Sequence, residues 1–278
     1  MKIAPLLLLP FLCLLAAGAR GQDPLVTQCV AQFPPGGARA QCVTPWLDGI
    51  VMLKSASAAL EAAEGLVRSG VMNVNDCHIM GHAVGHASWR KERDLGRAFG
   101  ACTNACIQGC MHGAVEAFMI DGPEGQTSPA RVRAFCDQLG ADSVERRQCL
   151  HGLGHGVMHQ HRKDLWGATN ACETVGGRHE ADLCLGGLWM QWAHFHIHQG
   201  ADAYSMVAPT MCDGVRDELL PECARAVGGG AMFTTGHDPA KSGSICQLLP
   251  AKQLGDCQRG VDYEVGLIRA GLGHAHGH

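Results

Sequence analysis

The chain has 278 residues, of which 46% are hydrophobic and 17% charged, with a formal net charge of −4. Its charges are mixed in sign and form no basic block, so nucleic acid is not expected as a partner. Beyond the first twenty residues, no stretch is apolar enough, for long enough, to predict a transmembrane segment.

The first twenty residues are typical of a secretory signal peptide. Lys2 precedes an apolar run over residues 3–15, and the small residues 17–19 predict cleavage near residue 20. Cleavage would leave fourteen of the fifteen cysteines, an even number that favours disulfides in an exported chain. We therefore expect a secreted or periplasmic protein. Residues 21–265 are expected to form a single α-helical repeat domain, and residues 266–278 a disordered tail rich in His and Gly.

The cysteines reveal an internal repeat. One set follows spacings of 33, 39, 35, 39 and 34 residues: Cys77, Cys110, Cys149, Cys184, Cys223 and Cys257. A second set precedes its last five members, with 7 to 12 residues between the partners: Cys102, Cys136, Cys172, Cys212 and Cys246. A period of this length is typical of two helices per unit.

Local signals agree with helices in chain order. Residues 46–70 have apolar residues at helical spacing and a glycine stop. Asp94 and Asp164 occupy equivalent positions, where each is expected to cap the helix that follows. Ser128 with Pro129 predicts the start of a further helix.

The repeat predicts an all-α solenoid of about six helical hairpins, each stapled by a disulfide. Because the first helix of a unit ends near one cysteine and the second begins near another, the two should pair across a short loop. The expected pairs are Cys102–Cys110, Cys136–Cys149, Cys172–Cys184, Cys212–Cys223 and Cys246–Cys257. Cys42 with Cys77 would complete the first unit, which leaves Cys29 for Cys106.

The stretch "ACTNACIQGCMHGA" resembles the cysteine-rich Sel1-like repeat proteins. Its match runs from Cys102 to Gly113, with seven residues between two cysteines and a glycine three positions after the second. The resemblance implies hairpins that are linked by disulfides and stacked as a solenoid, and it implies no activity. The other units depart from it, because their cysteines are further apart and several carry histidines.

Histidines recur at helical spacing in the second helices. "CHIMGHAVGH" and "CLHGLGHGVMH" each hold three histidines four residues apart. Residues four apart on an α-helix are rotated by only about 40° from one another around the helix axis, so the three histidines lie along one face as a stripe. When the second helices are aligned by their shared glycines, the unit between these two has His112 and Glu116 at the equivalent positions. The predicted metal ligands are His78, His82, His86, His112, Glu116, His151, His155 and His159.

Imidazole pairs at i and i+4 are a common way for helices to hold a metal. Nitrogen and oxygen ligands favour zinc, copper, iron or nickel, in a mononuclear or dinuclear centre with room for an open position. Glu116 would be either a ligand or the catalytic general base. His194, His196 and His198 could add ligands from the next unit, and the tail histidines could capture ions.

Two interpretations compete with a metal centre. The histidines could be buried structural residues that recur because the units are copies, or they could hold haem or another cofactor. The last two units have Arg225 and Arg259 instead, which confines the stripe to part of the chain, as expected of a site. The predicted functions are a metal-dependent oxidoreductase or hydrolase acting on a small-molecule or protein substrate, a copper or zinc carrier, or a protein-binding solenoid.

Overall fold

The computed structural model describes residues 23–33, 36–162, 164–197 and 200–269, and within them the chain is all-helical. These residues form fourteen α-helices and four short 3-10 helices, and no β-strand. The prediction of an all-α fold is confirmed for this part of the chain. The predicted signal peptide lies outside it, as does the tail from residue 270 onward. No helix within it is long and apolar enough to cross a membrane.

The helices alternate between a first and a second member of a pair, giving seven pairs among the described residues. The first helices are α1 (Pro24–Gln32), α3 (Ala56–Arg68), α5 (Leu95–Gly100), α7 (Pro129–Cys136), α9 (Leu165–Glu173), α11 (Ala201–Val207) and α13 (Pro239–Cys246). The second helices are α2 (Gly37–Leu53), α4 (Val74–Glu92), α6 (Gly109–Asp121), α8 (Val144–His161), α10 (Arg178–Ile197), α12 (Leu220–Thr234) and α14 (Ala251–Arg269). The 3-10 helices are η1 (Ala105–Gln108), η2 (Asp137–Leu139), η3 (Ala208–Thr210) and η4 (Asp217–Leu219).

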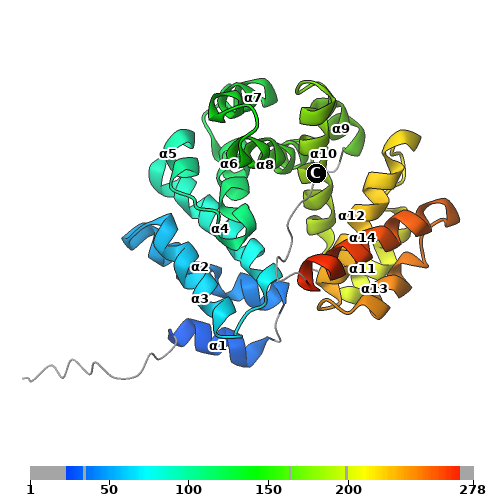
Figure 1. Ribbon diagram of the computed structural model, residues 1–278, viewed down its shortest axis with the longest axis horizontal. Helices are drawn as coiled ribbons and strands as arrows, with labels where there is room; N and C mark the ends of the chain where they lie inside the picture. Colours follow the sequence, from blue (N-terminus) through cyan, green and yellow to red (C-terminus); the bar gives the residue numbers. More distant parts are fainter. Residues whose placement is uncertain (1–22, 34–35, 163, 198–199, 270–278) are drawn as a thin grey trace, which may run out of the picture.

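Each second helix packs against the next one along the chain, from α2 to α14. Figure 1 shows the pairs following one another around a strongly curved arrangement, from the blue helices to the red ones. The curve brings distant units together, since the Asn73 side chain at the start of α4 lies 3.5 Å from His237 in the turn after α12. The second helices therefore surround a shared interior.

The helix predicted for residues 46–70 is in fact two helices. The chain leaves helical geometry at Lys54, and Ser55 then caps α3 by accepting a hydrogen bond from the Ala58 backbone N–H at 3.1 Å. Serine is a preferred N-cap residue because its hydroxyl satisfies a free N–H of the first turn. The apolar spacing continues across this break, so periodicity alone concealed it.

The predicted caps at Asp94 and Asp164 are confirmed. Asp94 accepts a hydrogen bond from the Arg97 backbone N–H at 2.8 Å, and Asp164 from that of Gly167 at 3.0 Å. Ser128 is also the N-cap residue of its helix, although its side chain makes no capping hydrogen bond.

Five of the predicted disulfides are confirmed, and each joins the first helix of a pair, or the segment that follows it, to the second helix of that pair. The other two predicted pairings are wrong, because the structure contains Cys29–Cys42 and Cys77–Cys106. A helical pair, α1 with α2, precedes the first unit that we assumed, and Cys42 is the second cysteine of that pair. The helix before α4 carries no cysteine, so Cys77 bonds forward to Cys106 in η1 instead.

Glycines bring neighbouring second helices into backbone contact. A Cβ atom placed on Gly113 of α6 would lie 2.2 Å from the carbonyl oxygen of His82 on α4. On Gly187 of α10 it would lie 1.9 Å from the carbonyl oxygen of His151 on α8. Only glycine permits so close an approach. The same contact recurs between α12 and α14 at Gly228, so it belongs to the helical repeat and does not depend on the histidines.

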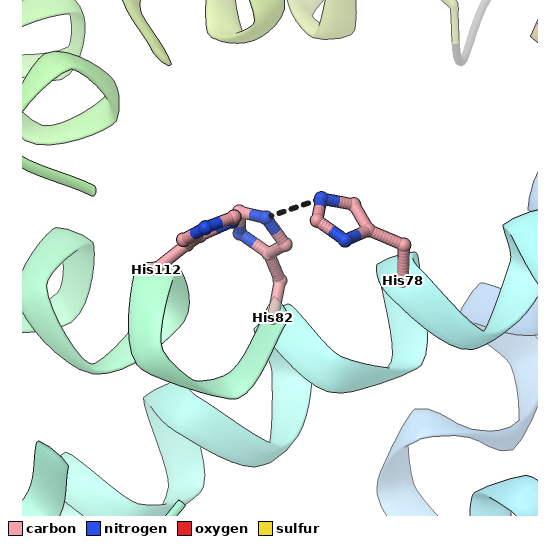
Figure 2. Close-up of side chains that lie close together, drawn as sticks. All are labelled: His78, His82 and His112. Atoms are coloured by element: carbon pink, nitrogen blue, oxygen red, sulfur yellow. Dashed lines mark hydrogen bonds between the residues drawn. The ribbon is translucent and has the colours of Figure 1, made fainter. Parts of the chain in front are cut away.

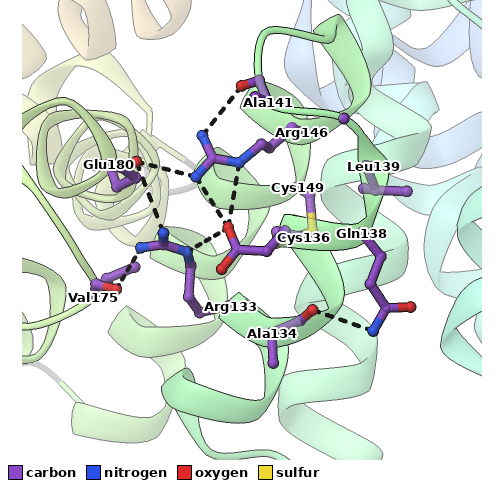
Figure 3. Close-up of polar contacts among 12 residues, drawn as sticks. Arg133, Ala134, Cys136, Gln138, Leu139, Ala141, Arg146, Cys149, Val175 and Glu180 are labelled. Atoms are coloured by element: carbon purple, nitrogen blue, oxygen red, sulfur yellow. Dashed lines mark hydrogen bonds and ion pairs between the residues drawn. A yellow bond between two sulfur atoms is a disulfide. The ribbon is translucent and has the colours of Figure 1, made fainter.

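An ion-pair network around the buried Arg146 also links neighbouring units (Figure 3). The Arg146 guanidinium on α8 lies 3.0 Å from a carboxylate oxygen of Asp137 and 3.0 Å from one of Glu180 on α10. Arg133 on α7 donates to Asp137 at 2.7 Å and to the Val175 carbonyl oxygen at 2.6 Å. The hydrogen bond from Arg146 lowers the pKa of Glu180 below its ordinary value. These contacts hold α7 and α8 against the next pair, α9 and α10.

Candidate metal centre

The eight predicted ligands converge from three adjacent helices into one connected cluster. Its members are His78, His82 and His86 on α4, His112 and Glu116 on α6, and His151, His155 and His159 on α8. Figure 2 shows the rings of His78 and His82 beside that of His112, which comes from the neighbouring helix. The predicted convergence is therefore observed, and the role of each residue as a ligand stays a prediction.

Burial divides the cluster into an inner and an outer part. The inner part consists of buried residues, of which none is more than 8% exposed: His78, His82, His112, Glu116, His151 and His155. His86 and His159 form the outer part, with side chains 29% and 30% exposed. Five imidazoles gathered in an interior are unusual for a purely structural core, since each ring carries two polar nitrogens that need partners.

Three overlapping groups within the inner part have the spacing of a metal site. In each, one potential ligand atom per residue lies within 4.8 Å of the others: His78, His82 and His112; His112, His151 and His155; His82, Glu116 and His155. The Nε2 atoms of His78 and His82 are 3.2 Å apart. Ligands of a tetrahedral zinc ion at 2.0–2.1 Å stand about 3.3 Å apart. The His78 and His82 nitrogens thus already have the separation that one ion requires.

The Glu116 carboxylate connects the two parts of the cluster. It lies 3.0 Å from Nδ1 of His82, 3.2 Å from Nε2 of His86 and 2.8 Å from Nε2 of His159. Burial alone would raise the pKa of Glu116, but the charge on His86 and hydrogen bonds from all three imidazoles hold it well below its ordinary value. An ionised carboxylate can only accept hydrogen bonds. Each of these three nitrogens is therefore a donor, which leaves Nε2 of His82 facing His78.

His155 is the clearest candidate ligand. Its Nδ1 lies 2.8 Å from the Oε1 atom of Gln191, which accepts the N–H and places the lone pair on Nε2. That Nε2 atom is buried and has no hydrogen-bond partner among the described residues. Burial and the nearby His82 lower the pKa of His155 to about 3, so the ring is neutral near pH 7. A neutral, oriented imidazole with an unused lone pair is the form in which histidine binds a metal.

His112 is oriented in the same way. Its Nε2 makes a short hydrogen bond to the Oε1 atom of Gln148 on α8, which places the lone pair of the neutral ring on Nδ1. Burial, followed by the neighbouring His82 and His155, holds the pKa of His112 well below its ordinary value. Metal-binding histidines commonly donate the N–H of their other ring nitrogen to an acceptor that orients the ring.

Gln148 and Gln191 are functional candidates that the sequence reasoning missed. Gln191 stands out in retrospect as a polar residue inside the apolar stretch "GGLWMQWAHF", and it is 4% exposed. Gln148 gives no comparable signal, because a glutamine on the first turns of a helix is ordinary.

Two cavities reach the cluster. The larger, of about 790 Å³, is lined by His78, His82 and His155 and by residues of α10, α12 and α14. The smaller, of about 380 Å³, lies between α2 and α4 and reaches His82, His86 and Glu116. A ligand in either cavity would contact the candidate metal centre directly.

The histidines proposed as additional ligands are only partly placed at the site. His194 on α10 lines both cavities. His196 packs edge-on against Trp192, with 4.9 Å between the ring centres. His198 and the tail histidines lie outside the described residues. Trp189 on α10 is 3% exposed and lines the larger cavity.

Comparison with known proteins identifies no relative: no family model matches the chain, and no curated protein or solved structure matches it significantly. The resemblance to Sel1-like repeats therefore stays a prediction. The candidate function depends on the geometry of the cluster itself.

Proposed function

We propose that this chain is an exported metalloprotein in which the histidine cluster holds one or two transition-metal ions. In this proposal His78, His82, His112, His151 and His155 are the inner ligands. Glu116 fixes the rings around it, as carboxylates commonly do for metal-binding histidines, and it reaches the metal in the group that it shares with His82 and His155.

The observation that carries the proposal is the buried Nε2 atom of His155, which has no hydrogen-bond partner among the described residues. Leaving a buried polar group unsatisfied costs about 1–3 kcal/mol. If His155 had only a structural role, this cost would reduce the stability of the fold. If its Nε2 atom binds a metal, the metal removes the cost. The Gln191 hydrogen bond, which orients the same ring, supports this interpretation.

A catalytic role is favoured over simple storage of metal. The larger cavity has the size of sites that bind small molecules, about 300–1,000 Å³, and three of the site imidazoles line it. A bound zinc ion would supply an activated water for hydrolysis, and copper or iron would supply oxidation–reduction chemistry. We therefore propose a metal-dependent hydrolase or oxidoreductase, and we retain the general base as the alternative to the ligand role of Glu116. The second candidate function is a copper or zinc carrier, which the partly exposed outer histidines favour.

The architecture and location that we propose are those expected from the sequence. Seven disulfides among the described residues are compatible with an exported protein. Six of them join the first helix of a pair, or the segment that follows it, to the second helix, and successive second helices pack side by side. Both features support a solenoid of disulfide-stapled hairpins, although the α3–α4 pair has no disulfide of its own.

Metal content measured by inductively coupled plasma mass spectrometry tests the proposal. The full chain would be exported through an oxidising compartment and purified without a metal column, with its tail histidines, His274, His276 and His278, replaced by alanine. We expect one or two equivalents of a single metal. The double variant His82→Ala with His155→Ala should lose it and keep its helical circular dichroism.

The matched control is His179→Ala, because His179 is an exposed histidine on α10 outside the cluster. Its metal content should equal that of the parent chain. A parent chain without metal, even after reconstitution, would refute the proposal. Metal in excess of two equivalents that exchanges freely with a chelator would favour the carrier over the enzyme.

A further inference from the structure

The larger cavity has the properties of a binding site for an organic molecule. Its volume is about 790 Å³, and α4, α8, α10, α12 and α14 all contribute to its walls. Trp189 and Met190 line it from α10 and Phe233 from α12. Sites for small molecules are typically concave and mostly apolar, with a few polar groups that orient the ligand.

The charged groups of the wall favour a cation. Five carboxylates and three guanidinium groups line the cavity. All three guanidinium groups already pair with carboxylates on their own helices: Arg178 with Asp182, Arg225 with Glu222 and Arg259 with Asp256. The excess of negative charge would repel an anionic ligand and attract a cationic one.

Glu264 on α14 is the carboxylate best placed to bind such a cation. It is 3% exposed, whereas Glu222, on the same wall, has a side chain that is 41% exposed. Glu264 lies against Gly229, where an added Cβ would be 3.7 Å from its Oε1 atom, at the wall formed by α12 and α14. A charge pair shielded from water is worth more than one at the surface.

We propose that the cavity binds an organic amine with an apolar body, and that Glu264 receives the ammonium group. The apolar body lies along Trp189 and Phe233 and extends toward the imidazoles on α4 and α8. The aromatic rings add a favourable interaction with the cation. This inference rests on the proposed function, because the amine is proposed as the substrate class of the same metal centre.

Isothermal titration calorimetry with three probes of similar size tests the inference. The probes are 2-phenylethylamine, 3-phenylpropionate and 2-phenylethanol, which are cationic, anionic and neutral near pH 7. We expect the unaltered chain to bind the amine at least about tenfold more tightly than the other two, as a buried charge pair allows. If the unaltered chain binds all three probes with equal affinity, or does not bind the amine, the inference is overturned.

The variant Glu264→Gln keeps the shape of the side chain and removes its charge. Its affinity for the amine should fall about tenfold or more, while its affinity for the neutral alcohol stays the same. The matched control is Glu61→Gln, an exposed glutamate on α3 that lies outside the cavity wall, and it should bind the amine as the parent does. An unchanged amine affinity in Glu264→Gln would exclude Glu264 as the recognition group.

The titrations would be run on both metal-free and metal-loaded protein. Amine binding to a chain that takes up no metal would support the cavity as a site and refute the metal centre. Metal uptake without amine binding would support the metal centre and refute this inference. The two proposals can thus fail separately.

Discussion

Replacing Gly187 by alanine should force α8 and α10 apart and weaken the candidate metal centre. The added Cβ would lie 1.9 Å from the carbonyl oxygen of His151 and 2.8 Å from its carbonyl carbon. An ordinary contact needs about 3.4 Å, so the helices must separate by about 1.5 Å at this crossing. The atoms in contact are backbone atoms of a helix, which cannot rotate away as a flexible side chain would.

The expected magnitude follows from two opposed effects. Alanine in place of glycine in a helix stabilises by about 0.5–1 kcal/mol. Overpacking costs about 1–3 kcal/mol, and a shift of this size belongs at the upper end of that range. The free energy of unfolding should therefore fall by about 2 kcal/mol, which for a chain of this length lowers the melting temperature by about 4–8 °C.

Urea unfolding of the oxidised protein, followed by circular dichroism, measures the change in stability. The matched control is Gly49→Ala on α2, where an added Cβ meets nothing within 4 Å. It should stabilise the protein by about 0.5–1 kcal/mol. Metal affinity should fall in Gly187→Ala alone, since Gln191 on α10 orients His155 on α8. A Gly187→Ala protein as stable as Gly49→Ala would refute the close contact.

Three further predictions address the site, the electrostatics and the disulfides. Gln191→Leu should weaken metal binding by about 10–100-fold, measured by competition with a chelator, because His155 loses the acceptor that orients its ring; unchanged affinity would remove Gln191 from the site. Because the pKa of Glu180 is lower in the folded chain than its ordinary value of 4.5, its stabilisation is present above that pH and is lost as the pH falls. The parent should therefore exceed Glu180→Gln in free energy of unfolding at pH 7 but not near pH 3, and a gap that persists in acid would contradict this reasoning. Peptide mapping of the oxidised protein should find Cys77 linked to Cys106, and any other partner would contradict the structure.

Local features of this protein followed directly from the sequence. Helical spacing placed three histidines on each of two helices, and five disulfides could be paired correctly because each closes a loop within one helical pair. The caps at Asp94 and Asp164 were equally predictable, since an N-cap acts on the backbone N–H groups of the next turn. In each case the interacting groups are close in sequence, so short-range geometry decides the outcome.

Contacts between units required the tertiary structure. The Cys77–Cys106 bond depends on where η1 meets the start of α4, and no spacing rule contains that information. The partners of the imidazoles, Gln148 and Gln191, lie 36 residues from His112 and His155. Their meeting depends on the register between neighbouring helices.

The curvature of the repeat was the least accessible feature. It results from the crossing of one second helix over the next, where glycines such as Gly113 and Gly187 let backbones touch. Each crossing adds to the one before it, so small angles that no local pattern specifies accumulate along the chain. Only that accumulated curve brings Glu264 on α14 to the same cavity as His82 on α4. The sequence by itself therefore determined which residues are available for a metal, and the tertiary structure decided what surrounds them.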